Sequence, residues 1–388
     1  MSSLYLHFAA CCTHCHLVPE IQEHPDHHSP DEDASGSKTL TNWELAQGNV
    51  NVAFKYYYHL ASKAINKNFF YSPVAVSIAY FLLSLGAKSA TLRHHFSKLK
   101  CDPTELSEQK KREGVLSLLH VLNRPEAKCQ MSTGNAIFTD DKVQGLQKLL
   151  DDAEDLINTT DSGYSKLVDL IKVLDPEFVM VYINYIFLNA YMENPFYYQP
   201  TQEQDFFVDD VTTVKVEMMH KAGCYNTYHD QELYCEVVQM PYKSNASALF
   251  ILPEPGKMRL VEEAMGEKLL QRWQDSLRLS KMDIYLPKLS QSDCDAMEIS
   301  KSLDRTAVFS DQSGISRKAE LKMPKAIHKS YLNTYENGTG AAGTIDIEMV
   351  QISRPIEITF NRPFLLIIFN NITSDNLFFR RAVNPNEP

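Results

Sequence analysis

The 388-residue sequence lacks any uninterrupted apolar run of the length, roughly 18 residues, that crosses a bilayer. It also lacks an excess of basic residues, because 38 Lys and Arg stand against 49 Asp and Glu, for a formal net charge of −11. General nucleic-acid binding depends on positive charge and is therefore not expected. We predict a soluble chain that has neither a membrane nor a nucleic acid as its partner.

Sequence signatures of catalysis are missing as well. The chain has no G-x-S-x-G nucleophile turn, no H-E-x-x-H metal motif and no phosphate-binding loop. Its 13 histidines stand outside any such context, which is typical of surface or hydrogen-bonded histidines. The sequence therefore predicts no catalytic residue, no metal site and no cofactor, and the protein is not expected to be an enzyme.

The eight cysteines do not have the spacing of a disulfide framework. The segment from Cys12 to His16 spells the C-x-x-C-H haem-attachment motif, and Cys11 with three nearby histidines offers metal-ligand residue types. Both sites need a folded scaffold, whereas this segment reads as a signal or tail, so neither haem nor metal is predicted. The other five are expected to be small core or surface residues: Cys101, Cys129, Cys224, Cys235 and Cys294.

The N-terminal region differs in composition from the rest of the chain. Residues 1–16 contain an apolar stretch without a basic residue before it, which makes a poor secretory signal. Residues 20–38 are rich in His, Asp, Glu and Pro and cannot bury enough apolar surface to order themselves. No Gly/Ser-rich or Pro-rich linker follows. We therefore predict a signal-like segment with a disordered extension over residues 1–42 and a single domain over residues 43–388.

Hydrophobic periodicity predicts helices first and strands later. Helical spacing covers residues 45–65, 105–122 and 146–156, and Ser72-Pro73 begins a helix toward Leu85. A further helix is predicted over residues 257–279, with Trp273 and Leu277 on one face. Strands are predicted at residues 135–138, 178–188, 213–218, 236–240 and 248–252. This order is typical of an α+β fold with mixed sheets.

A run of very small residues near the C-terminus has the composition of a hinge. It extends from Glu336 to Thr344 and lies between a strand-like segment at residues 326–332 and two more at residues 356–360 and 364–369. A loop that is expected to be exposed connects the hinge to Pro355. A merely flexible linker is the alternative interpretation, because glycine-rich loops are common.

The same run also spells G-x-G-x-x-G through Gly338, Gly340 and Gly343, the pattern of a dinucleotide-binding turn. That turn requires a helix immediately afterwards, within a βαβ unit. The following residues 344–350 are instead β-branched and alternating, and Arg354-Pro355 comes next. A cofactor site is therefore not predicted here.

Several separate motifs, in order, resemble those of the serpin family, most closely its plasma antitrypsin/antichymotrypsin/kallistatin-like group. The resemblance covers most of the chain and implies the serpin fold, with mixed β-sheets, N-terminal helices and an exposed reactive-centre loop. The motifs are Asn68-Phe69-Phe70-Tyr71-Ser72-Pro73-Val74, residues 83–88 with Thr91, Asn184-Tyr185-Ile186-Phe187, residues 245–253, Leu286-Pro287-Lys288-Leu289, Phe360-Asn361-Arg362-Pro363-Phe364 and Asn384-Pro385.

The resemblance implies a secreted, extracellular, monomeric inhibitor of serine proteases. In such a protein the loop is cut and then enters the main sheet as a new strand, while the protease is still attached. Residues that begin this insertion must be small and uncharged, because they pass between packed strands. The implied hinge residues are Glu336, Gly338, Thr339, Gly340, Ala341, Ala342, Gly343 and Thr344.

Alignment of the loop by the resemblance, without a gap, implies a reactive bond between Ile352 and Ser353. An isoleucine fits an apolar protease pocket, so an elastase-like or chymotrypsin-like protease is the expected partner. Cleavage after Arg354 is disfavoured by Pro355, and Met349-Val350 is the second choice.

Other features depart from the family pattern. The chain is about 20 residues shorter than its relatives around residues 152–167, which removes most of a strand and part of the helix that crosses the main sheet. Met192 replaces a usual tryptophan, Arg380 replaces a usual glycine, and residues 309–314 are a shortened segment. A non-inhibitory serpin, such as a carrier of a small hydrophobic ligand, and an inactive shortened variant therefore stay open as alternatives.

Two kinds of surface signal complete the sequence. Lys110, Lys111 and Arg112 form a basic triple, near the helix where the resemblance implies heparin binding in some members; a solvated helix face is the preferred explanation. A sugar at the hinge sequon would oppose insertion. The glycosylation candidates are Asn158, Asn245, Asn337 and Asn371.

Overall fold

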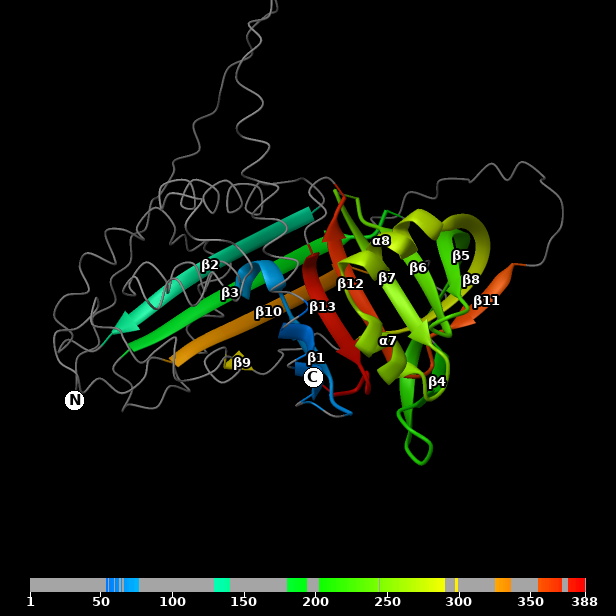
Figure 1. Cartoon of the computed structure of the whole chain (residues 1–388), viewed down its shortest axis with the longest axis horizontal. Helices are drawn as coiled ribbons and strands as arrows, with labels where there is room; N and C mark the ends of the chain where they lie inside the picture. The colour runs from blue at the N-terminus through cyan, green and yellow to red at the C-terminus, as the bar shows by residue number, and fades with distance from the viewer. Residues whose placement is uncertain are drawn as a thin grey trace, which may run out of the picture.

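The computed structural model describes residues 54–76, 129–139, 180–193, 202–289, 297–298, 325–335, 355–371 and 376–387, with single-residue gaps at 55, 59, 63, 65 and 244. These residues form two mixed β-sheets and helices, so the predicted α+β class is confirmed (Figure 1). Helical residues between 54 and 62 and at 73–76 agree with the two N-terminal helices that were predicted. The predicted helices at residues 105–122 and 146–156 lie outside the described residues.

The larger sheet has nine strands and is antiparallel except at one edge, where β11 runs parallel to β8. Its strand order is β1-β13-β12-β7-β6-β5-β8-β11, and β4 pairs with β5 beside this path. The strands are β1 (Phe69–Tyr71), β4 (Gln202–Phe207), β5 (Thr213–Asp230), β6 (Cys235–Pro241), β7 (Ala246–Pro253), β8 (Arg278–Pro287), β11 (Ile356–Thr359), β12 (Phe364–Asn370) and β13 (Asn376–Ala382).

The smaller sheet, called the main sheet below, has four described strands in the order β2-β3-β10-β9. They are β2 (Cys129–Thr139), β3 (Met180–Tyr191), β9 (Met297–Glu298) and β10 (Lys325–Tyr335). In Figure 1, β2, β3 and β10 lie side by side as three long strands. The strands predicted at residues 178–188 and 326–332 are thereby confirmed.

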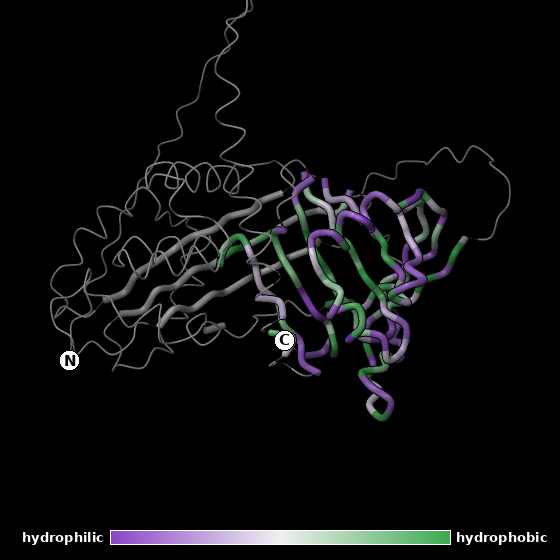
Figure 2. The backbone as a smooth tube through the Cα atoms, in the orientation of Figure 1, coloured by the Kyte–Doolittle hydropathy of each residue, from purple (hydrophilic) through white to green (hydrophobic). Residues whose placement is uncertain are grey.

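The core is concentrated where β7, β12 and β13 pair. All eight residues of β7 and all seven of β13 are buried, and Figure 2 shows apolar stretches along these segments, with a hydrophilic stretch on β13. Such unbroken burial requires cover on both faces of the sheet. Part of that cover comes from α7 (Met258–Ala264) and α8 (Glu267–Ser276), which lie across one face in Figure 1.

The single helix predicted over residues 257–279 is wrong. The chain turns extended at Met265, where ψ is 127°, and α8 then begins after Gly266. Glycine is a poor helix former, which favours a break at this point. The segment also ends as a strand, because β8 begins at Arg278. The predicted inward face does hold, since Trp273 is fully buried and Leu277 packs against the same core.

Asn68 explains why two distant motifs occur together. Its Oδ1 accepts hydrogen bonds from the backbone N–H groups of Val383 at 2.6 Å and Asn384 at 3.0 Å. Its Nδ2 donates to the carbonyl oxygens of Asn384 at 2.7 Å and Glu387 at 2.9 Å. Four hydrogen bonds from one side chain therefore fix the segment after β13 against the start of β1.

Candidate functional site

The two strands that bracket the predicted reactive loop are both described. β10 ends at Tyr335, directly before the hinge, and β11 begins at Ile356, shortly after the predicted reactive bond. The hinge residues 336, 338–344 and the bond between Ile352 and Ser353 lie outside the described residues, as do residues 152–167, 309–314 and the basic triple. The candidate site is therefore built from its two anchors.

The first anchor forms a parallel pair with β3. The register joins Lys325 to Val181 and continues without a shift to Tyr335 and Tyr191. A segment that follows β10 and folds back between the two strands would run antiparallel to both. Antiparallel ladders are slightly more stable per residue than parallel ones, so the β3–β10 junction is a place where an added strand improves the pairing.

The end of this junction is joined to the larger sheet by Met192. This residue is buried, and it forms an isolated antiparallel bridge with Tyr242 just after β6. The next N–H, that of Glu193, donates to the carbonyl of Pro241 at 2.9 Å. Methionine is unbranched and adapts to irregular gaps, so its substitution for tryptophan keeps the position within the core.

A buried lysine lies close to the same turn and was missed by sequence analysis. Lys221 on β5 is only 5% exposed, and its Nζ is 5.8 Å from the centroid of the Tyr225 ring. Burial and the positive charge of Lys243 lower the pKa of Lys221 to about 7. A lysine in an alternating strand looks like a surface residue in the sequence, so no signal there could have found it.

The second anchor is fixed by backbone and side-chain contacts. Phe360, which follows β11, is fully buried, and its backbone N–H donates to the carbonyl of Tyr285 at 2.8 Å. Its ring packs edge-to-face against Phe250 and Phe364, with centroids 5.8 Å and 5.3 Å away. Arg362 Nε donates to the carbonyl of Pro253 at 2.7 Å. These contacts hold the chain in place directly after the loop.

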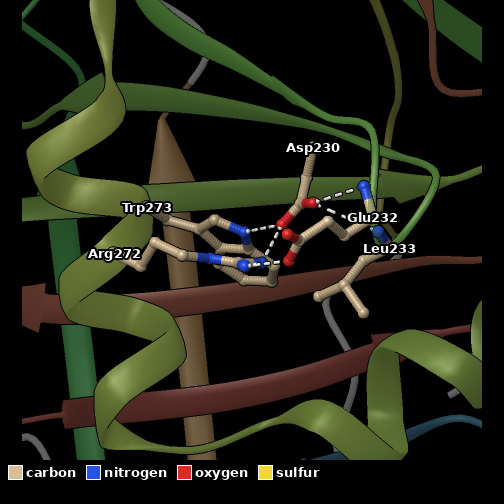
Figure 3. Close-up of polar contacts among 5 residues, drawn as sticks. All are labelled: Asp230, Glu232, Leu233, Arg272 and Trp273. Atoms are coloured by element: carbon tan, nitrogen blue, oxygen red, sulfur yellow. Dashed lines mark hydrogen bonds and ion pairs between the residues drawn. The ribbon is translucent and has the colours of Figure 1, made fainter.

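Asp230 is the most heavily hydrogen-bonded carboxylate among the described side chains (Figure 3). Its oxygens accept from Trp273 Nε1 at 2.7 Å, from Arg272 Nη2 at 2.6 Å, and from the N–H groups of Glu232 and Leu233 at 3.0 and 3.1 Å. Burial alone would raise the pKa of Asp230, but these donors lower it overall. Because its oxygens are taken up by the protein itself, this site joins α8 to the β5–β6 turn and is structural.

The departure at Arg380 is accommodated inside the sheet. Its side chain is 4% exposed and lies over the Phe70 ring, 6.0 Å from the centroid. The neighbouring Arg381 bonds Glu262 Oε1 at 3.0 Å, and Tyr57 donates to the same oxygen at 2.8 Å. Charges buried in this way are tolerated because they are paired and stacked.

Two of the four sequon asparagines are described, and both are exposed. Asn245 and Asn371 lie on neighbouring turns, where the N–H of Asn371 donates to the carbonyl of Asn245 at 2.7 Å. Asn158 and Asn337 lie outside the described residues. Among the cysteines that the structure describes with side chains, Cys224 is exposed and Cys235 is buried, and both are free, in line with the prediction for these two.

The described residues contain no group of His, Cys, Asp and Glu that could hold a metal ion. Within the same residues, no helix has the length and apolar character needed to cross a membrane.

Comparisons with known proteins identify the family. The family model described as Serpin (serine protease inhibitor) matches residues 47–385. Alpha-1-antiproteinase of Bos taurus is 36% identical over 369 residues, which cover 89% of each chain. The structure of human glycosylated kallistatin has a TM-score of 0.77 and 34% identity, and the match covers 89% of this chain and 99% of that one.

A second solved structure, human thyroxine-binding globulin complexed with thyroxine, has a TM-score of 0.76 and 30% identity, over 89% of this chain and 99% of that one. The family model and the antiproteinase relative both name proteases as the kind of partner. The chain belongs to the serpin family and has the serpin fold.

Proposed function

We propose that this serpin is a secreted inhibitor of serine proteases that acts by insertion of its cleaved loop into the main sheet. The observation that carries the proposal is the uninterrupted parallel pairing of β10 with β3, together with the position of the hinge directly after β10. The antiproteinase relative and the similarity to kallistatin support the same activity. A monomer in the extracellular space fits this activity, and exposure of Asn245 and Asn371 fits glycosylation of these two sites.

The chemistry belongs to the protease. Its serine oxygen bonds to the carbonyl carbon of Ile352, the bond to Ser353 breaks, and the released amine takes up a proton. The segment from the hinge to Ile352 is then free at one end. It can enter between β3 and β10 while the ester still holds the protease, replacing one parallel ladder by two antiparallel ones. Each net hydrogen bond gained contributes about 1 kcal/mol, so a full strand supplies a large driving force.

The residue before the reactive bond, Ile352, sets the expected protease specificity. Ile352 has a β-branched apolar side chain, which cannot form an ion pair at the base of a protease pocket. We therefore expect an elastase-like or chymotrypsin-like target.

The test is incubation of the chain with proteases of both types, followed by a denaturing gel and mass spectrometry. A covalent complex, together with a released peptide that begins at Ser353, is the expected result. A released peptide that begins at Val350 or Pro355 would show that the reactive bond lies elsewhere than between Ile352 and Ser353. Complete cleavage without a complex would exclude inhibition by trapping.

Carriage of a small hydrophobic ligand is the second candidate function, favoured by the similarity to thyroxine-binding globulin in its hormone complex. The third candidate is an inactive shortened variant. One observation favours it: among the described strands, β2 pairs with β3 only, so no described strand lies beyond β2 in the main sheet. Thermal unfolding distinguishes an inhibitor that traps its protease from a ligand carrier and from an inactive variant. A chain that inserts its loop becomes more heat-stable after cleavage, whereas a carrier or inactive variant does not.

A further inference from the structure

Two of the predicted glycosylation sites lie opposite each other at one end of the larger sheet. β12 pairs with β7 beside it in Figure 1, and the register runs without a shift until Asn370 is opposite Ala246. The next pair in this register is Asn371 and Asn245, and the backbone N–H of Asn371 donates to the carbonyl oxygen of Asn245 at 2.7 Å. The antiparallel ladder therefore continues by one pair into two turns and places the two asparagines directly across from each other.

The two asparagine side chains share one side of the sheet. Residues directly opposite in an antiparallel pair point to the same side, with Cβ atoms roughly 4.5–5.5 Å apart. Asn245 and Asn371 are both exposed, whereas the neighbouring pair, Ala246 and Asn370, is buried and half-buried. Either amide is therefore open to modification, but the two amides share the space outside them.

The backbone beneath the pair is held on both strands. The N–H of Tyr242 donates to the carbonyl of Ala246 at 3.0 Å and closes the turn before β7. Ala246, Ser247 and Phe369 are only 5%, 2% and 6% exposed. Moving the two asparagines apart would break the hydrogen bond between them and expose these buried residues, so their spacing is fixed in the folded chain.

N-glycosylation would attach a bulky group at this narrow spacing. The side-chain amide nitrogen of asparagine bonds to C1 of the first N-acetylglucosamine and gives up one proton. The bond from C1 to the phosphate oxygen of a lipid-linked oligosaccharide diphosphate breaks, and the lipid diphosphate leaves. A hexosamine ring with its acetamido group is wider than the gap between two opposite Cβ atoms. Two such rings, each with further sugars attached, would collide above Asn245 and Asn371.

We propose that Asn245 and Asn371 form one shared glycan site, at which each folded molecule carries a single N-linked chain. The Asn245 sequon lies earlier in the chain and is presented first, before Ser247 is buried in β7. When β12 then pairs with β7, Asn371 meets a filled neighbour, and it takes the glycan only in molecules whose Asn245 is empty. This inference rests on entry into the secretory pathway, which is part of the proposed function.

The experiment counts glycans on the full chain, which is expressed in glycosylating cells behind a cleavable secretory signal. Secreted material that unfolds in one thermal transition is analysed by intact mass, and peptide mass spectrometry after enzymatic deglycosylation gives the occupancy of each asparagine. Asn245→Gln and Ser247→Ala remove the first sequon in two ways, and Asn371→Gln removes the second. The double variant with both glutamines removes the pair, and Asn158→Gln, in a sequon outside the pair, is the control.

Removing either sequon of the pair alone should leave the number of glycans per molecule unchanged, and removing both should lower it by one. Asn245→Gln and Ser247→Ala should raise the occupancy of Asn371 from a minority of molecules to most of them, whereas Asn158→Gln should not change it. Two independent sites would instead lose one glycan in each single variant and two in the double variant. That result would overturn the shared site.

A protease-trapping assay on the same material keeps this inference apart from the proposed function. One glycan at the pair in a chain that traps no protease supports the shared site and removes the inhibitory function. Two glycans at the pair on folded molecules that trap normally overturn the shared site and leave the function intact. If neither asparagine is modified in the secreted chain, the shared site is wrong whatever the trapping assay gives.

Discussion

The two sheets of this serpin differ in how their central strands are paired. In the larger sheet, β7 lies between antiparallel neighbours and every one of its residues is buried. In the main sheet, the central pair β3 and β10 is parallel, and β10 leads directly into the hinge. Under the proposed function, the β3–β10 pair opens to admit another strand, whereas the central strands of the larger sheet stay paired.

Thr339→Arg is expected to have the largest effect and acts on the sheet that opens. A guanidinium carried between β3 and β10 during insertion would be buried without a partner, at a cost of several kcal/mol. The protease should still cut the loop, but the covalent complex should be lost. Thr339→Ser, which stays small and uncharged, is the control. An unchanged complex yield with arginine would show that the hinge does not enter the sheet.

Asp230→Ala should have the next largest effect, on the sheet that stays closed. It removes the acceptor for Trp273 Nε1 and for the N–H groups of Glu232 and Leu233, and it leaves Arg272 with only an exposed carboxylate. The free energy of unfolding should fall by about 3 kcal/mol, because buried donors lose their partners.

Denaturant unfolding measures this loss, with Glu232→Gln as the control at the exposed end of the same cluster. If both variants unfold at the same denaturant concentration, Asp230 does not hold α8 to the turn in the way that Figure 3 indicates.

Lys221→Met tests the boundary between the sheets and should have the smallest effect. The pKa of Lys221 is about 7 in the folded chain and lies below its value of 10.5 in the unfolded chain. Between these values the unfolded state binds the extra proton, so stability should rise as pH increases from about 7 to 10. The rise is on the order of 1 kcal/mol after allowance for solvent screening. The methionine variant should show a flatter profile of melting temperature against pH, whereas parallel profiles would contradict the assignment.

Local patterns in the sequence predict the strands that are apolar or alternating. Residues 326–332 and 364–369 alternate or are continuously apolar, and they form β10 and β12. β8 was missed, because its first residues, Arg278 and Leu279, were assigned to the helix predicted over residues 257–279 and no strand was predicted after it. β13 was hidden as well, because Arg380 and Arg381 read as surface residues and are buried only through partners supplied by distant segments.

The candidate site also has some features that local sequence predicts and others that depend on long-range pairing. The hinge composition and the sequence position of the loop are local and were predicted, whereas the pairing of β3 with β10 joins segments far apart in the sequence. The same applies to Asp230, whose bond to Trp273 spans 43 positions. Hydrophobic periodicity has no information at that range, so the contacts that organise both sheets required the structure.

Because β1 pairs with β13, this part of the larger sheet can form only late in synthesis of the nascent chain. Phe69 is registered with Arg381, and Asn68 bonds a backbone group 316 positions later. At typical translation speeds of 5–20 residues per second, the first strand waits roughly 15–60 s for its neighbour to be made. Throughout that interval Phe69, Phe70 and Tyr71 have no sheet to join. Slow or interrupted synthesis should therefore favour capture of this segment by chaperones, and a ribosome-stalled chain that ends before β13 should stay protease-sensitive around β1.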